Sequence, residues 1–260
     1  MTITSADIAA WLGTYLWPFT RIGAMLGVVP VFGARSVPVR VRLALAIALT
    51  LVLAPVIPPA PAVDALGARA LLIAVQQVVI GLAMGFALQM AFAALSIGSQ
   101  AIATSMGLGF ASMIDPQSGV QVPVLSQFYL LLATLIFLAL NGHLILIEVL
   151  ADSFRVLPVG MQGVTRSGFW ALAGWAGQMF AGAALIALPA VAALQVVNLA
   201  FGVMTRAAPQ LNIFSVGFPI TLMLGLVVVL MTLPDIQSSV MRLSMAAFEL
   251  MRRLAAGGSG

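Results

Sequence analysis

The charged side chains with the most suggestive spacing lie in the stretch LNGHLILIEVLADSFRVLP, residues 140–158. Glu148, Asp152 and Arg155 occupy positions i, i+4 and i+7, so they share one helix face and can partly neutralise one another. His143 lies about 140° around the helix from Glu148, which gives no obvious proton relay. Three interpretations are open: an interfacial cluster that anchors a helix end after a break at Asn141, a proton pathway, and pairing with partner subunits.

A second polar group lies in MTRAAPQLNIF, residues 204–214. Pro209 suits the first turn of a new helix. Gln210 and Asn212 can satisfy the backbone groups that a turn leaves open. Arg206 beside them marks either a hairpin tip with polar caps or a contact site at a subunit interface.

Motifs of enzymatic chemistry are missing from the sequence. It contains no HExxH, no GxSxG, no P-loop and no dinucleotide fingerprint. A chain with no cysteine and one histidine argues against a zinc site built from protein ligands alone. Asp115 lacks the second membrane-depth aspartate that an intramembrane aspartyl protease requires. We therefore expect no enzyme, no cofactor and no metal, and the net charge of +4 on few charged residues does not imply nucleic-acid binding.

The elements that carry these residues are apolar enough for a bilayer. The chain of 260 residues is 62% hydrophobic and 7% charged, with a mean hydropathy of +1.16. Soluble domains are about 25% charged, so the composition predicts an all-α integral membrane protein. Six main hydrophobic segments are expected, at about residues 8–30, 43–57, 70–100, 125–150, 171–200 and 213–233.

Prolines make several of these segments poor straight spans. Pro18, Pro189 and Pro219 fall inside segments, and Pro234 is the expected end of the sixth. Because proline frees a backbone carbonyl, we expect bent, proline-interrupted helical hairpins buried in protein. Small residues at four-residue spacing predict dense helix packing; they are Gly23 and Gly27, Gly81 and Gly85, and Ala173, Gly177 and Ala181.

The segment after Pro234 is amphipathic. Its apolar residues recur in steps of three and four, which puts them on one helix face: Ile236, Val240, Leu243, Ala247, Leu250 and Leu254. We expect this helix to lie on the membrane or to dock a partner. The final residues, 257–260, are read as a linker or a natural tail.

Three stretches together resemble the FliR family of the bacterial flagellar type III export apparatus: GLGFASMIDPQSG, LNGHLILIEVLADSFRVLPVG and RAAPQLNIFSVGFPITLMLG. The early RIGAMLGVVPVFGARSVPVRVRLALA is similar to that family's first hairpin. The resemblance covers nearly the whole chain, with its motifs in the expected order. The flagellar member of the wider family fits these stretches better than the virulence-secretion homologue.

The resemblance implies an export gate in the bacterial inner membrane, at the flagellar basal body. One FliR copy would assemble with FliP and FliQ into a closed helical cone raised toward the periplasm. Residues 1–165, with the loop 105–120, would be organised like FliP, and residues 170–255 like a FliQ hairpin. FlhB and FlhA would be further partners, and unfolded flagellar subunits would be the substrates.

In that family the segment matching residues 106–119 helps to plug the closed pore. Residues too apolar for water and too irregular for lipid need protein around them, and a pore lumen supplies it. Glycines would let the backbone bend, methionines would seal an irregular constriction, and Asp115-Pro116 would end the loop with a turn. The expected plug residues are Met106, Gly107, Leu108, Gly109, Phe110, Met113, Ile114, Asp115, Pro116 and Gly119.

A second class of function stays open on the sequence alone. A membrane channel or small-solute transporter of different ancestry would use Glu148, Asp152 and Arg206 in its pathway. A third class, a membrane scaffold without a pore, would give the loop no role in sealing.

Overall fold

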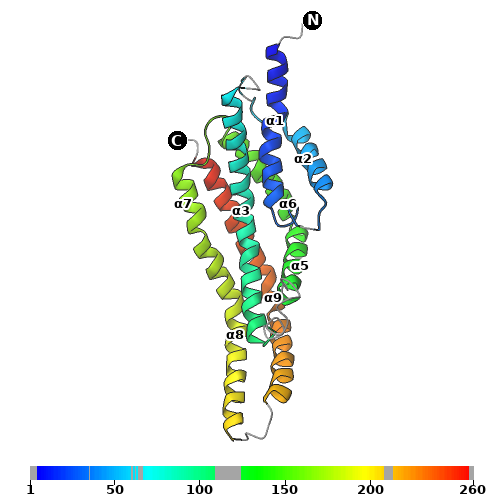
Figure 1. Cartoon of the computed structure of the whole chain (residues 1–260), viewed down its shortest axis with the longest axis vertical. Helices are drawn as coiled ribbons and strands as arrows, with labels where there is room; N and C mark the ends of the chain where they lie inside the picture. The colour runs from blue at the N-terminus through cyan, green and yellow to red at the C-terminus, as the bar shows by residue number, and fades with distance from the viewer. Residues whose placement is uncertain are drawn as a thin grey trace. The chain divides into compact units, whose positions relative to one another are not determined.

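The computed structural model describes residues 5–34, 36–59, 61, 63, 67–108, 124–207 and 213–257, with the side chains of 5–12 and 213–216 left aside. All regular structure in these residues is helical (Figure 1). The helices are α1 Ser5–Val28, α2 Val39–Leu53, α3 Ala68–Ser105, α5 Val124–Ala139, α6 Gly142–Val156, α7 Arg166–Gly174, α8 Ala176–Ala207 and α9 Ile213–Ala256.

The six predicted hydrophobic segments all correspond to helices, which confirms the all-α prediction. Within the part of the chain that the structure describes, three helical stretches are long and apolar enough to cross a membrane: Ala68–Ser105, Arg166–Ala207 and Gly217–Ala256. The pair α5 and α6 passes the same test together and is bent by 69° at its break. Helix α2 has 15 residues, or about 22 Å, which is shorter than the roughly 30 Å of hydrocarbon.

The helices contribute to two compact units, each gathered from separate parts of the chain. Unit 1 consists of Met1–Met90, Asn141–Ala176 and Ser244–Gly260. Unit 2 consists of Ala91–Leu140 and Gly177–Leu243. The two-part organisation predicted from the resemblance divides the chain by sequence rather than by contacts, and it stays a prediction.

Close helix packing in unit 1 depends on the glycines of α3. A Cβ on Gly81 would run into the Arg21 carbonyl oxygen and approach Ala24 Cβ to 3.0 Å, and one on Gly85 would lie 2.9 Å from the Met25 carbonyl oxygen. The matching spacing on α1 has a different environment, because no heavy atom lies within 4 Å of a Cβ on Gly23. The α3 glycines therefore bring the α1 and α3 backbones together.

Unit 2 is built on the same principle with different small residues. A Cβ on Gly98 of α3 would lie 2.8 Å from the Ala183 carbonyl oxygen of α8, and one on Gly182 would lie 2.8 Å from Leu243 Cδ2 of α9. Phe92 and Phe137 pack edge to face with their ring centroids 5.8 Å apart. The packing joins α3 to α5 and α8, and α8 to α9.

The four prolines named above all lie inside helices, including Pro234, which was expected to end one. Pro18 lies inside α1, Pro189 inside α8, and Pro219 and Pro234 both inside α9. The expected end of the sixth segment at Pro234 is therefore wrong, since α9 runs through Pro234 to Ala256 and has 44 residues in all. Neighbouring helices can hold a proline-containing helix together by packing around the freed carbonyl.

The apolar stripe of the last helix lies in the core rather than on the membrane or a free surface. Ile236, Val240, Ala247, Leu250 and Leu254 are all at most 5% exposed. The helical spacing of these apolar residues was predicted correctly. The prediction that they lie on the membrane or dock a partner was not correct, because the chain itself buries most of them. It covers five of the six residues of the stripe that was expected to meet lipid or a partner, and the sixth, Leu243, is half-buried.

Candidate functional site

The segment predicted to plug a pore begins with a well-defined helix end. Gly107 has φ 82°, a left-handed conformation that glycine adopts without strain. Its N–H donates to the Thr104 carbonyl, and the Leu108 N–H donates to the Ala103 carbonyl, both at 3.0 Å. This pair of bonds is a Schellman motif, so Gly107 ends α3 and turns the chain away from it.

Met106 anchors the root of that segment within unit 2. It is 1% exposed, and its Cγ lies 2.5 Å from where a Cβ on Gly225 of α9 would be. The Asn198 amide of α8 donates to the Ser105 carbonyl at 3.5 Å. The hairpin of α8 and α9 thus holds the end of α3 at the point where the predicted plug begins.

The helices on either side of the segment are also joined to each other. Ser99 Oγ of α3 donates to Ser126 Oγ of α5 at 3.1 Å, and Ser126 Oγ lies 3.4 Å from Gln100 Oε1. Both serines are buried, so this polar contact ties the two stems together. The remaining predicted plug residues lie outside the described residues: Gly109, Phe110, Met113, Ile114, Asp115, Pro116 and Gly119.

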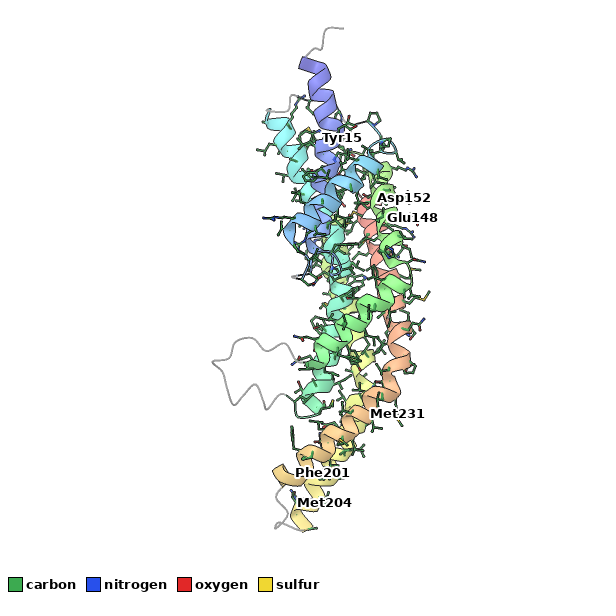
Figure 2. The ribbon with its side chains drawn as sticks, turned by 90° about the vertical axis from the view of Figure 1, so that its right-hand side faces the viewer. Tyr15, Glu148, Asp152, Phe201, Met204 and Met231 are labelled. Atoms are coloured by element: carbon green, nitrogen blue, oxygen red, sulfur yellow. The ribbon has the colours of Figure 1, made fainter. Side chains whose placement is uncertain are left out.

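The charged face of α6 is on the surface of the chain (Figure 2). Arg155 Nη1 lies 3.3 Å from Asp152 Oδ1, and these side chains are 58% and 44% exposed. Glu148 is exposed and takes part in neither of the two ion pairs that the described residues form. An exposed pair of this kind stabilises little by itself, and it fits a helix anchor or a partner contact better than a buried pathway.

The break before α6 is made by Asn141. It has φ 58°, and it is the residue that precedes Gly142 at the start of α6. Asparagine tolerates this left-handed conformation better than most residues. His143 follows in the first turn, half-buried, and its Nδ1 is buried without a hydrogen-bond partner among the described residues.

The predicted polar group near residues 204–214 is only partly described. Arg206 is exposed in the last turn of α8, where its charge complements the helix C-terminus. Gln210 and Asn212 lie outside the described residues. Arg206 belongs to unit 2, whereas Glu148 and Asp152 belong to unit 1.

A buried arginine that the sequence reading did not select as a site connects three helices of unit 1. Arg21 of α1 is 0% exposed. Its Nε donates to Gln77 Oε1 of α3 at 2.8 Å, and its Nη2 donates to the Leu157 carbonyl at 2.9 Å. Its Nη1 donates to the carbonyl and the hydroxyl of Ser153 at 3.1 and 3.2 Å, and its guanidinium lies 4.1 Å from the ring centroid of Phe154.

The acceptors around Arg21 explain how a charge is stable there without a carboxylate. The carbonyls of Ser153 and Leu157 are at the end of α6, where a helix carries partial negative charge. The ring of Phe154 adds a further attraction to the cation. An arginine in the middle of the apolar segment 8–30 was a signal available in the sequence, because burying such a charge needs a specific environment.

The long apolar helices and the match to known sequences together show which class of protein this chain belongs to. Residues 12–247 match the family model described as "Bacterial export proteins, family 1", and the chain belongs to that family. Its relatives carry the name flagellar biosynthetic protein FliR. The one from Escherichia coli (strain K12) is 41% identical over 226 residues, covering 87% of this chain and 86% of the relative.

Two further relatives with the same name cover even more of the chain. The FliR of Pectobacterium carotovorum subsp. carotovorum is 38% identical over 253 residues, 96% of each chain. That of Bacillus subtilis (strain 168) is 31% identical over 246 residues, 93% of this chain and 94% of the relative. The chain is accordingly an inner-membrane protein with a role in flagellar export.

Proposed function

We propose that this protein is a non-enzymatic subunit of the flagellar export gate. It forms, with FliP and FliQ, a closed pore through which unfolded flagellar subunits leave the cell, and residues 106–119 plug that pore. FlhB and FlhA are its further neighbours. The gate is raised from the membrane toward the periplasm, and one copy of this chain takes part in it.

The observation that carries this proposal is the length of the apolar helices compared with a bilayer. Helices α3 and α9 have 38 and 44 residues, about 57 and 66 Å, roughly twice the 30 Å of hydrocarbon. Exposed large apolar side chains on α9 extend from Phe218 to Met245, a distance of about 40 Å. Lipid alone does not cover such a surface, so neighbouring protein is needed.

The root of the loop supports the plug. A plug must be held firmly at its base while its tip blocks the lumen. Met106 seated beside Gly225, the Schellman turn at Gly107 and the Ser99–Ser126 bond give such a base.

Co-expression with the neighbouring export proteins tests the assembly. The chain is expected to co-purify with FliP and FliQ as a large hetero-oligomer that electron microscopy resolves as a closed cone. A stable homo-oligomer that transports a small solute would refute this and would favour the transporter with Glu148, Asp152 and Arg206 in its pathway. The exposed Asp152–Arg155 pair gives that alternative no support.

Deletion of residues 107–115 tests the plug. The assembled gate should leak ions and lose or deregulate export, while its amount in the membrane stays the same. A matched control is Gly23→Ala, since a Cβ there meets open space. If the deletion assembles and leaves ion leakage unchanged, the protein is a scaffold and the loop does not seal.

A further inference from the structure

Two helices that meet at Arg21 each carry a buried N–H group without a hydrogen-bond partner among the described residues. These groups are the indole Nε1 of Trp17 on α1 and the amide Nε2 of Gln77 on α3, and the two residues are 3% and 0% exposed. The orientation of the Gln77 amide is fixed, because its Oε1 accepts a hydrogen bond of 2.8 Å from Arg21 Nε. Since a buried donor normally has an acceptor, the two N–H groups indicate that a further group accepts from them.

The contacts between α1 and α3 show how the two helices are aligned. A Cβ on Gly81 would run into the Arg21 carbonyl oxygen, and a Cβ on Gly85 would lie 2.9 Å from the Met25 carbonyl oxygen. From the first contact to the second, both helices advance by four residues. The two helices therefore run in the same direction and stay in register over this turn.

One turn earlier on the two helices, the same register brings Trp17 to the level of Gln77. The Arg21 side chain extends to this level too, because side chains on a helix lean toward its N-terminus and because Arg21 Nε bonds Gln77. A guanidinium has five N–H groups, and Arg21 forms four hydrogen bonds with the described residues. The indole, the amide and the guanidinium thus bring several hydrogen-bond donors to one buried place.

The positive charge of Arg21 is stabilised by neutral groups only. Its acceptors are an amide, a hydroxyl and two backbone carbonyls, and it takes part in neither of the two ion pairs that the described residues form. Groups of this kind carry partial charges, so a net positive charge remains on a residue that is 0% exposed. An anion beside the guanidinium would offset the cost of burying that charge.

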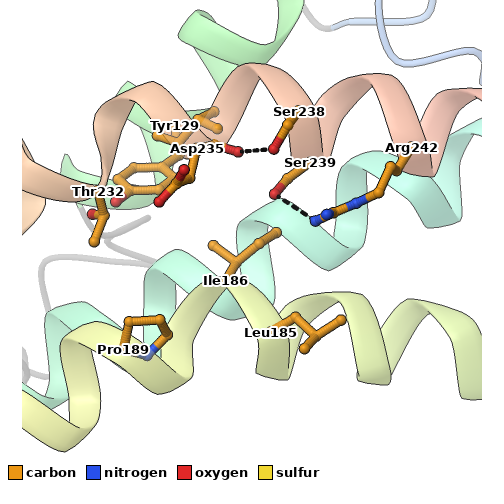
Figure 3. Close-up of a pocket in the computed structure, with 10 residues that line it drawn as sticks. Tyr129, Leu185, Ile186, Pro189, Thr232, Asp235, Ser238, Ser239 and Arg242 are labelled. Carbon is orange, nitrogen blue, oxygen red and sulfur yellow. Dashed lines mark hydrogen bonds between the residues drawn. The ribbon is translucent and has the colours of Figure 1, made fainter.

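Arg242 of α9 shows the opposite situation. It lines a cavity in unit 2 together with Asp235, and its Nη2 donates to Ser239 Oγ at 3.2 Å (Figure 3). Both charged residues are exposed, so water solvates their charges and neither requires a ligand. Solvent does not reach Arg21 in this way, because that residue has no exposed surface.

The donors around Arg21 suit an anion better than a water molecule. A water molecule accepts hydrogen bonds but brings two O–H groups of its own, which also need acceptors. The buried side-chain atoms that lack a partner among the described residues are all nitrogens, so no unpaired side-chain oxygen accepts from those O–H groups. An anion has no proton to place and also balances the guanidinium charge. Because Gln77 and Arg21 are 0% exposed, the site is closed to a partner's side chain and admits only a small ion.

From these observations we propose that unit 1 binds one small inorganic anion, such as chloride, between Trp17, Gln77 and Arg21. The ion accepts hydrogen bonds from the indole Nε1–H, the amide Nε2–H and the remaining guanidinium N–H. It joins α1 to α3, so the stability of unit 1 depends on the anion concentration. The site is separate from the proposed plug and does not depend on the proposed gate.

Thermal unfolding of the full-length protein in detergent tests the site. The midpoint is measured in potassium chloride and in potassium gluconate of the same ionic strength, because gluconate is too large for an enclosed site. An ion that binds only the folded state stabilises it in proportion to the logarithm of the ion concentration. For a chain of about this size, each tenfold increase in chloride above its dissociation constant should raise the midpoint by roughly 3–5 °C. The gluconate series should show no such rise.

Two substitutions assign the effect to this site. Trp17→Phe keeps an aromatic ring and removes one donor, so the rise should begin at about tenfold higher chloride, as expected for the loss of one hydrogen bond to a charged group. The matched control is Trp170→Phe at a residue that is 68% exposed, and it should leave the chloride dependence unchanged. Gln77→Glu places a carboxylate beside Arg21, which replaces the ion, so this variant should unfold at the same temperature in chloride and in gluconate.

Two results would overturn the proposal. Equal midpoints of the unmodified protein in chloride and gluconate at every concentration would mean that no anion binds. A chloride-dependent rise that stays the same in Trp17→Phe or in Gln77→Glu would mean that the ion acts elsewhere on the protein. The unmodified protein alone decides the first result, so folding of the variants does not limit it.

Discussion

The Arg21 contacts make a quantitative prediction about stability. Replacing Arg21 with Met keeps an unbranched chain of similar length but removes every donor. Gln77 Oε1 and the Leu157 carbonyl then lose their partner in a buried environment, whereas the Ser153 carbonyl still accepts from the Leu157 N–H and the Ser153 hydroxyl still donates to the Leu150 carbonyl. Each unsatisfied buried group costs about 1–3 kcal/mol. Part of this loss is offset because the variant no longer has to desolvate a charged side chain. We expect a net loss of about 3–5 kcal/mol, as for other broken buried charge contacts.

The assay is thermal unfolding of the purified protein in detergent, followed by far-UV circular dichroism. For a chain of this size a loss of 3–5 kcal/mol corresponds to a fall of roughly 6–20 °C in the midpoint. The control is Arg155→Met in the same unit, where the exposed pair with Asp152 contributes at most about 1 kcal/mol. The Gln77→Leu variant combined with Arg21→Met should lose less than the sum of the two, because they remove one shared contact.

One outcome would refute this reasoning. If Arg21→Met and Arg155→Met unfold at the same temperature, the Arg21 bonds contribute nothing beyond an exposed pair. Additive effects of Arg21→Met and Gln77→Leu would likewise show that the two side chains do not act together.

Three other pairs of substitutions test two helix contacts and the turn at Asn141. Gly81→Ala forces a Cβ into the Arg21 carbonyl and should destabilise by about 1–3 kcal/mol, whereas Gly23→Ala should be neutral or stabilising by up to about 1 kcal/mol; equal effects in thermal unfolding would contradict the assigned helix contact. Gly225→Ala should displace the Met106 side chain and lower the midpoint, and adding Met106→Ala should restore much of it; no rescue would mean that the contact is not the cause. Asn141→Leu should destabilise by about 1–2 kcal/mol while Asn141→Gly is tolerated, since φ is 58°; similar unfolding of both would contradict the left-handed turn.

Hydropathy and spacing predicted the helices well because membrane helices carry their own backbone hydrogen bonds. The apolar segments and the period of the C-terminal stripe were therefore readable without any tertiary information. The predicted helix end at Pro234 was wrong, because packing against neighbouring helices can keep a segment helical where the intrinsic helix propensity of proline would end it. The break at Asn141 was anticipated, and Asn141 adopts the left-handed conformation there.

The candidate site was less predictable, because it depends on contacts between distant segments. Nothing in the sequence indicates that Gly225 faces Met106, or that Gly81 faces α1 while Gly23 faces open space. Arg21 could have been selected as a charge in an apolar segment, but its partners are 56 and 132 residues further along the chain. Spacing rules describe neighbours on one helix and do not identify partners at that separation.

The composition of unit 1 sets the order in which the chain can mature. Its contributors range from α1 to the end of α9, Ser244–Gly260. On the ribosome, Arg21 is therefore made long before Ser153 and Leu157, and until α6 has been synthesised only Gln77 among its side-chain and carbonyl acceptors is present. Because Ser244–Gly260 also belongs to unit 1, the unit is complete only when synthesis of the chain has reached the end of α9.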